Sequence, residues 1–363
     1  MSKRTVAILG AALVVLLALV IFGQRSSAPV SSGSALVPDL QAALGDISRV
    51  AVVKANGETV ATLEKGTDNW VVADKHGYIA NAAKLRQALT ALAEAHILEE
   101  KTANPELYAR LGVEDVTAAN AAGVSVALTA AGHELPTIIL GNAEGSKFRY
   151  VRRAGEAQSY LIDRNPDVPR AAAQWLDSGI IDVRGDRVRE VTVTHGDGEV
   201  VHLSKAAPEL ANFEVAGVPA GRELSYPGVA NVIGNALREL NLEDVEPAAP
   251  PADKPTIVEF RTFDGLVVRL TGEKSADASW ITIEASVDAA QAAAAPPPAA
   301  PAEGAAASTP PPADPNAEAA RINAKVGGWR YKIAGYQYDQ MTRRMSELLK
   351  APPAAAPAPG SRP

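Results

Sequence analysis

The first hydrophobic segment of the chain is an unbroken apolar run, Val6–Phe22, which follows the basic pair Lys3 and Arg4. A helical rise of about 1.5 Å per residue makes this run roughly 25 Å long, close to the thickness of a bilayer's hydrocarbon core. The run lacks the polar face of a helix that packs on a soluble core. We therefore expect residues 1–23 to form a transmembrane anchor that crosses the inner membrane through residues 5–23, with a cytoplasmic N-terminus.

A cleaved signal peptide is the alternative for this segment. Its apolar region would be shorter, about 7–15 residues, and would end at an Ala-x-Ala-like site. Here Ser26-Ser27-Ala28 is followed by Pro29, a poor setting for cleavage. An uncleaved anchor predicts a bacterial, single-pass inner-membrane protein whose remaining chain is periplasmic or extracytoplasmic, and residues 24–46 then form a flexible tether.

Alternating apolar and polar positions predict strands in the next part of the chain. Residues 50–53 lead through Asn56-Gly57 into residues 60–63, a pattern typical of a β-hairpin. A third strand is predicted at Trp70, followed by a helix with Asn81 as its N-cap. The helix contains Leu85, Ala88, Leu89 and Leu92, and it precedes predicted strands at 123–128, 137–141, 148–151 and 159–162 and a short helix at 170–176.

The same succession of patterns returns later in the chain. It comprises strands at 191–193, 200–203 and 213–215, a helix from Val229 to Leu240, strands at 256–260, 266–270, 280–283 and 328–333, and a helix at 339–349. Strand runs joined by hairpins, with helices segregated between them, predict an α+β fold with antiparallel sheets. We expect two tandem repeats of mainly antiparallel strands plus helices, over residues 47–182 and 183–350, preceded by the transmembrane helix.

Low-complexity sequence interrupts the second predicted repeat. An Ala/Pro-rich stretch at about residues 285–320 offers few branched or aromatic side chains to bury, so it predicts a disordered insertion loop between the last two strands. The tail over residues 351–363 has the same composition and the same expectation. Because apolar patterning resumes at Ile322, the sequence after the insertion is expected to fold back onto the preceding strands.

Composition and charge exclude several classes of function. The 363 residues contain no cysteine and carry a formal net charge of −7. The lack of cysteine excludes disulfide-stapled domains, thiol catalysis and thiolate-bound metals. The acidic balance argues against nucleic-acid binding, which depends on basic side chains that neutralise phosphates.

The repeated plan resembles a known family. The residues that carry the resemblance are the Trp70 strand with the Leu85–Leu92 helix, Leu111-Gly112-Val113, the strand that ends at Gly141, and the closing segment 328–333 with Asp339 and Leu348-Leu349. In these features the chain resembles the DUF4340 domain over most of residues 47–350. The resemblance implies one N-terminal membrane segment, an exposed α+β body and an association with gliding-motility-type ABC transporter subunits. It implies no catalytic or ligand residue.

Residues that carry chemistry form no recognisable catalytic or metal motif. The five histidines lack the spacing that places two imidazoles on one helix face, although His195 and His202 flank a predicted hairpin turn. The segment 141–147 has the wrong spacing for a phosphate loop and is expected to join two strands. Arg184-Gly185-Asp186 is expected to be a chance match to an adhesion tripeptide. We therefore expect no catalytic residue, cofactor or metal.

One basic cluster stands out in this acidic chain. It consists of Lys147, Arg149, Arg152 and Arg153, and strand alternation places Lys147, Arg149 and Arg153 on a common face. A solvated sheet face is the simplest interpretation. The functional alternative is a docking patch for an acidic partner or anionic lipid headgroups.

The sequence thus favours a non-enzymatic, membrane-anchored accessory subunit of an ABC-type transport system in the cell envelope. Its expected partners are other envelope proteins, including ABC permease or ATPase subunits. Two alternatives stay open. One is a periplasmic module that binds a glycan or small ligand, for which Trp70, Trp280 and Trp329 are candidate stacking residues; the other is a hydrolase built on a convergent pair of carboxylates.

Overall fold

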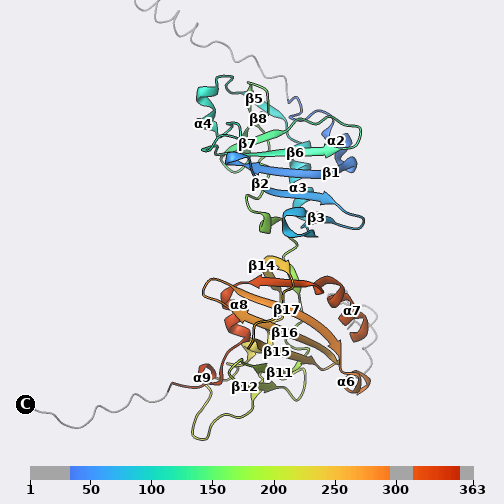
Figure 1. The fold of residues 1–363 in the computed structure, drawn as a ribbon, viewed down its shortest axis with the longest axis vertical. Helices are drawn as coiled ribbons and strands as arrows, with labels where there is room; N and C mark the ends of the chain where they lie inside the picture. The colour runs from blue at the N-terminus through green and yellow to red at the C-terminus, as the bar shows by residue number, and fades with distance from the viewer. Residues whose placement is uncertain (1–32, 295–313, 352–363) are drawn as a thin grey trace, which may run out of the picture. The chain divides into compact units, whose positions relative to one another are not determined.

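The structure is a computed structural model that describes residues 33–294 and 314–351 (Figure 1). The chain forms two compact units, described separately below. Of the described residues, the first unit comprises 33–74 and 79–175, and the second comprises 75–78, 176–294 and 314–351. The predicted anchor at 1–23 lies outside the described residues, as do positions 352–363 of the predicted tail. The predicted flexible tether at 24–46 is wrong over its described part, because Leu36 and Leu40 are buried in the first unit and a short helix forms at Leu40–Ala43. In the described ranges, no helix combines the length and the apolar character needed to cross a bilayer.

The first unit is built on a nine-stranded sheet. Its strand order is β4-β3-β2-β1-β6-β7-β8-β9-β5, and all neighbouring strands from β3 to β5 in this order pair antiparallel. The strands are β1 (Ile47–Lys54), β2 (Glu58–Lys65), β3 (Trp70–Val72), β4 (Tyr78–Ile79), β5 (Ile97–Glu100), β6 (Val124–Ala130), β7 (Ile138–Glu144), β8 (Phe148–Arg153) and β9 (Ser159–Ile162). The α-helices are α2 (Leu40–Ala43), α3 (Ala82–Ala93) and α4 (Tyr108–Leu111), and the 3-10 turns are at Leu44–Asp46, Ala55–Gly57, Ala73–Lys75, Pro105–Leu107 and Ala172–Trp175.

Local sequence rules explain the first hairpin and the main helix. Asn56 and Gly57 both adopt positive φ, at 61° and 67°, in the turn that returns β1 into β2. The Asn81 side chain accepts a hydrogen bond from the Lys84 N–H at 2.9 Å, so Asn81 is the N-cap of α3 as predicted. The apolar face of α3 is buried through Leu85, Ala88, Leu89, Leu92 and Ala93.

The second unit contains another nine-stranded sheet. Its order is β10-β14-β18-β17-β16-β15-β11-β12-β13, again with antiparallel pairings. The strands are β10 (Gly179–Ile181), β11 (Val188–Thr194), β12 (Val200–Ser204), β13 (Glu214–Val215), β14 (Leu240–Pro247), β15 (Thr256–Thr262), β16 (Leu266–Lys274), β17 (Ser279–Val287) and β18 (Trp329–Ile333). The helices are α5 (Asn231–Gly234), α6 (Ala289–Ala294), α7 (Pro315–Val326), α8 (Gly335–Met341) and α9 (Met345–Leu348).

The α+β class with large antiparallel sheets is confirmed. In chain order, β1 to β3 occupy the same places in the first sheet as β11 to β13 do in the second, and β6 to β9 correspond in the same way to β15 to β18. In each unit a helix follows the set of three strands, and one further strand follows that helix. This strand, β5 in the first unit and β14 in the second, lies next to the last of the four later strands, β9 or β18. Because β10 pairs with β14, the second unit begins before the predicted boundary between residues 182 and 183.

Two predicted helices differ from the structure. The helix expected from Val229 to Leu240 is only one short turn, α5. After it, Ala236 and Arg238 bond carbonyls three residues back, and the chain turns at Glu239, where φ is 49°. Leu240 then begins β14. The helix expected at 339–349 is divided into α8 and α9, with extended backbone at Arg344 between them.

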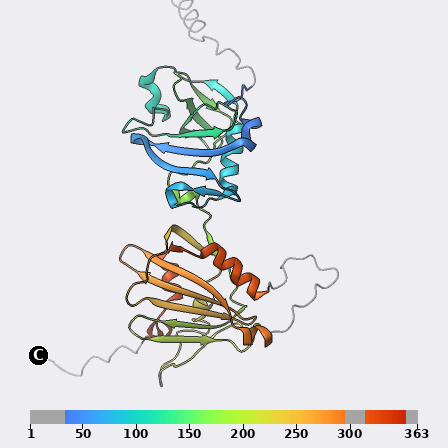
Figure 2. The same cartoon turned by 45° about the vertical axis from the view of Figure 1, so that its right-hand side comes forward.

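The predicted disordered insertion at 285–320 is wrong at both of its ends. Ala285 lies in β17, and α7 begins at Pro315, within the predicted loop. The side-chain amide of Asn323 on α7 accepts from the Ala285 N–H at 2.8 Å and donates to the Ala285 carbonyl at 2.7 Å, so it completes the hydrogen bonding of the strand edge. Figure 2 shows α7 lying along this sheet. Residues 295–313 are outside the described part of the chain.

Candidate functional site

The predicted basic cluster does not form one exposed surface. Arg152 on β8 is only 2% exposed, so it cannot belong to a solvent-facing patch. Its guanidinium donates to the Val113 carbonyl at 2.8 Å, the Glu156 carbonyl at 2.9 Å and the Asp115 carboxylate at 2.7 Å. It also lies over the Tyr108 ring, 4.5 Å from the centroid. Arg152 therefore holds three segments of the first unit together.

The other three cations of this cluster differ in exposure. Arg153 is half-buried, and its guanidinium donates to the Leu36 carbonyl at 2.9 Å. Arg149 is also half-buried; burial, reinforced by the neighbouring charge of Arg170, lowers the pKa of its guanidinium. Lys147 is exposed in the turn between β7 and β8. A docking role for Lys147 and Arg149 stays a prediction.

The histidines flanking the second hairpin are not partners. His202 on β12 faces Thr192, with 3.2 Å between its Nδ1 and the threonine hydroxyl oxygen. His195 is buried beyond the end of β11, and its Nε2 has no hydrogen-bond partner among the residues that the structure describes. In residues 33–294 and 314–351, no group of three or more His, Asp or Glu side chains is placed to hold a metal ion.

The remaining sequence candidates are held by local structure. Residues 141–147 form the end of β7 and a turn into β8, as predicted. In the Arg-Gly-Asp tripeptide, the Arg184 guanidinium pairs with the carboxylate of Asp186. Trp175 is buried, and Trp70, Trp280 and Trp329 are half-buried.

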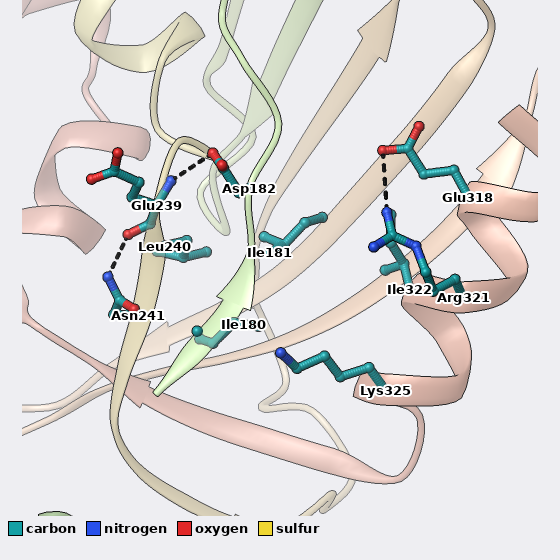
Figure 3. A pocket seen from close by; sticks show the side chains of 11 residues that line it. Ile180, Ile181, Asp182, Glu239, Leu240, Asn241, Glu318, Arg321, Ile322 and Lys325 are labelled. Carbon is teal, nitrogen blue, oxygen red and sulfur yellow. Dashed lines mark hydrogen bonds and ion pairs between the residues drawn. The ribbon is translucent and has the colours of Figure 1, made fainter. Parts of the chain in front are cut away.

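A cleft in the second unit is the strongest candidate site. It lies between the edge strand β10, with the start of β14, and one face of α7, and it has a volume of about 460 Å³ (Figure 3). Four nearly buried aliphatic side chains form its floor: Ile180, Ile181, Leu240 and Ile322. We call this space the β10–α7 cleft.

The backbone of β10 is only partly paired. The strand is the last in its sheet, so β14 is its one neighbour. Gly179 pairs with Asn241 and Ile181 with Leu240, which leaves Ile180 as the extra residue of a bulge. An edge strand with unpaired backbone groups is a template on which another extended chain can add. The β10–α7 cleft therefore has an apolar floor beside an incomplete strand edge.

The two walls of the cleft carry opposite charges. Asp182 and Glu239 lie beside β10 and β14, and the Asp182 carboxylate accepts a hydrogen bond from the Glu239 N–H at 3.0 Å. On the other side, α7 contributes Arg321 and Lys325, and Lys325 extends toward β10 (Figure 3). The cleft is thus polarised across its width.

An ion-pair triad, in which Glu318 is buried and Arg187 and Asp264 are half-buried, fixes the α7 wall. The Arg187 guanidinium donates to the Glu318 carboxylate at 2.8 and 3.1 Å and to the Asp264 carboxylate at 2.7 Å. Burial alone would lower the pKa of Arg187, but its hydrogen bonds to both carboxylates outweigh burial and raise that pKa above its ordinary value. The guanidinium therefore stays charged at any physiological pH, and α7 is held in place through Glu318.

A second open cavity, of about 670 Å³, lies in the same unit, between the turn that joins β11 to β12 and the C-terminal helices α8 and α9. It is lined by charged side chains that already pair with one another. Arg344 bonds the carboxylates of both Asp197 and Glu199, and Lys274 bonds Asp339. These contacts tie the C-terminal helices to the sheet, so the cavity offers few uncommitted charges to a ligand.

The β10–α7 cleft was not predictable from local sequence patterns. Its α7 wall falls partly within the Ala/Pro-rich stretch at residues 285–320, and β10 is a three-residue strand without a clear periodic pattern. One usable signal was Glu318, Arg321, Ile322 and Lys325, which recur at the spacing of one helix face. Even so, only the folded chain brings this face to β10.

Comparison with protein families decides the classification. A family model described as "Domain of unknown function (DUF4340)" matches residues 70–257, just over half of the chain. The chain belongs to the DUF4340 family. The match runs from β3 into β15, so the β10 and β14 wall of the cleft lies within the DUF4340 match, whereas α7 follows it. Comparisons with curated proteins and with solved structures gave no match.

Proposed function

We propose that this DUF4340 protein is a non-catalytic, membrane-anchored accessory subunit of an ABC-type transport system, with its folded units outside the bacterial inner membrane. The observation that carries the proposal is the β10–α7 cleft, which suits an extended segment of another protein. The apolar run of residues 5–23 after two basic residues supports the anchor. The sequence resemblance supports the transporter association.

Strand addition is the binding mode that this cleft favours. In that mode, a peptide forms main-chain hydrogen bonds with an exposed sheet edge, and pockets beside the edge receive alternate side chains. The edge here is the side of β10 that faces away from β14, where the described part of the chain places no further strand. Three strand residues span about 10 Å, enough for a short stretch of partner chain to pair.

The chemistry of the walls favours binding over catalysis. Glu318 is occupied by Arg187, and Asp182 accepts a backbone N–H, so these carboxylates serve structural contacts. The aliphatic floor can desolvate side chains of a bound segment. None of the residues that line the cleft is a tryptophan, so this cleft offers no indole on which a sugar would stack.

We also propose that the two units are copies of one ancestral fold. The matching places of the strand triplets and strand quartets in both sheets support this duplication. The equivalent hairpins, at Asn56-Gly57 and at residues 196–199, support it at the level of sequence. In this view, one copy acquired a binding edge at β10 while the other kept a structural role.

Site-specific photocrosslinking tests the proposed function. A photoreactive residue at Asn241, an exposed cleft position on β14, is introduced into the full-length protein in intact bacterial membranes. We expect it to capture the permease subunit of an ABC transporter, which is the subunit exposed on the same side of the membrane as the cleft. Glu214, exposed on the strand at the opposite end of the same sheet, is the matched control position.

Two outcomes would contradict this proposal. Absence of any transporter subunit from the Asn241 adducts would remove the transporter assignment. Capture of the same chains with equal yield from Glu214 would show that β10 is not the contact. A chain that lacks residues 1–32 is expected to lose the capture, because the anchor holds the cleft beside the membrane that contains the partner.

A further inference from the structure

We propose that the β10–α7 cleft selects an acidic segment: the extended partner chain that adds to β10 carries a carboxylate side chain next to an aliphatic one, and Arg321 binds that carboxylate. The inference rests on the proposed function and names the chemistry of the occupant. It makes Arg321 the specificity-determining residue of the cleft.

Arg321 is the least committed cation on the α7 wall. Its side chain is 77% exposed, and the carboxylate oxygen paired with it, on Glu318, lies 3.9 Å away. Glu318 itself is engaged by Arg187 at 2.8 Å, so its negative charge is already neutralised by a closer partner. Arg321 can therefore offer its guanidinium to a carboxylate from outside, in the bidentate geometry that arginine favours.

Lys325 adds a second positive charge to the α7 wall. It lies one helical turn after Arg321 and lines the cleft beside it. Its Nζ is 3.2 Å from the Asp177 carboxylate, which leaves its ammonium partly compensated. Together, the two side chains give the α7 wall a positive field, with Arg321 as the direct binding group.

The opposite wall fixes the orientation of the occupant. Asp182 and Glu239 are both exposed at the β10 and β14 side of the cleft. A carboxylate directed toward them would be repelled, whereas one directed toward α7 would be attracted. In an extended chain, side chains alternate between the two sides, so an aliphatic neighbour of the acidic residue is turned away from α7 and can contact the apolar floor.

A peptide-binding experiment tests the selection directly. The probes are immobilised pentapeptides, Thr-Val-X-Val-Thr, with Glu, Gln or Lys at X, exposed to the full-length protein in detergent. We expect the Glu peptide to bind at least about tenfold more tightly than the Lys peptide. Arg321→Glu should abolish or invert this preference, and Arg321→Lys should keep part of it.

The control is an arginine substitution on the surface of the first unit, at a residue that does not line the cleft. Arg86→Glu changes an exposed arginine on α3 of the first unit and should leave the preference unchanged. Equal binding of the Glu and Lys peptides, no binding of either, or a preference that survives Arg321→Glu would overturn the inference. Capture of a transporter subunit from Asn241 in any of these cases would leave the proposed function standing without acidic selection.

Discussion

Replacement of Glu318 should loosen α7 and destabilise the second unit. The Glu318 side chain is 6% exposed and accepts two hydrogen bonds from the Arg187 guanidinium, at 2.8 and 3.1 Å. Glu318→Ala leaves that largely buried cation with Asp264 as its remaining carboxylate, at 2.7 Å. Removal of one partner from a buried ion pair costs about 3–5 kcal/mol. Because Asp264 remains, we expect about 3 kcal/mol, the low end of that range.

The conservative variant separates charge from hydrogen bonding. Glu318→Gln keeps one carbonyl oxygen toward Arg187 but loses the charge, so it should cost about 1.5 kcal/mol, the difference expected when a charge-assisted hydrogen bond becomes a neutral one. Glu284→Ala is the matched control, because Glu284 is exposed on the neighbouring strand β17. Its effect should stay within about 0.5 kcal/mol.

Urea-dependent hydrogen exchange, read by mass spectrometry on the full-length protein in detergent, measures this effect. Peptide resolution is needed because tryptophan fluorescence combines signals from both units, with Trp175 in the first and Trp280 in the second. Protection of α7 and β17 should fall together in Glu318→Ala. A loss below about 1 kcal/mol, or an α7 that exchanges at the wild-type rate, would refute the idea that the Arg187–Glu318 pair holds this wall.

Three further perturbations test other parts of the fold, each by urea unfolding with peptide-resolved exchange. Arg152→Met should cost about 3 kcal/mol, since it leaves buried carbonyls without a donor, whereas Arg86→Met on the surface should be nearly neutral. Gly141→Ala should cost about 1–3 kcal/mol, because its Cβ would lie 2.3 Å from a backbone oxygen, and Gly45→Ala, which meets no atom within 4 Å, should be tolerated. Burial lowers the pKa of Lys205, so its charge opposes folding below that pKa; stability should therefore rise with pH between the lowered value and about 10.4, and Lys205→Met should remove that slope. If the substitution leaves the pH dependence of stability unchanged, the inference that burial lowers the pKa of Lys205 is wrong.

Elements with strong local determinants could be predicted from the sequence. The Asn56-Gly57 turn needs positive φ at both residues, and that requirement is met by these residue types alone. Asn81 caps α3 because the cap and the apolar spacing after it are both local. The strands β6 to β9 and β15 to β18 likewise follow from the alternation of apolar and polar residues within each segment. The sequence therefore predicted these strands correctly, although some begin or end at other residues than expected.

Elements decided by distant contacts could not be predicted in this way. The pattern after Val229 fits a helix, yet the chain turns at Glu239 and Leu240 begins a strand that pairs with β10 and β18. Arg152 belongs to a basic run, but its three acceptors lie on other segments of the first unit, and these draw it into the interior.

The candidate site was less predictable than the fold for the same reason. The start of α7 resembles filler in composition, yet the helix is held in place by Arg187, in the turn before β11, and by Ala285 on β17. Neither wall of the cleft has a motif of its own. What makes it a candidate is the combination of an incomplete strand edge, an apolar floor and a charged helix, and that combination exists only in three dimensions.

The terminal strands of both sheets are short, and this limits how the molecule can aggregate. The first sheet ends in β4, with 2 residues, and β5, with 4; the second ends in β10, with 3, and β13, with 2. Long, flat edges template edge-to-edge polymerisation, and brief ones offer few backbone groups to an identical neighbour. At high local concentration, copies of this chain can therefore stand side by side without fusing into continuous sheets, while a three-residue edge still admits one short, well-matched foreign strand.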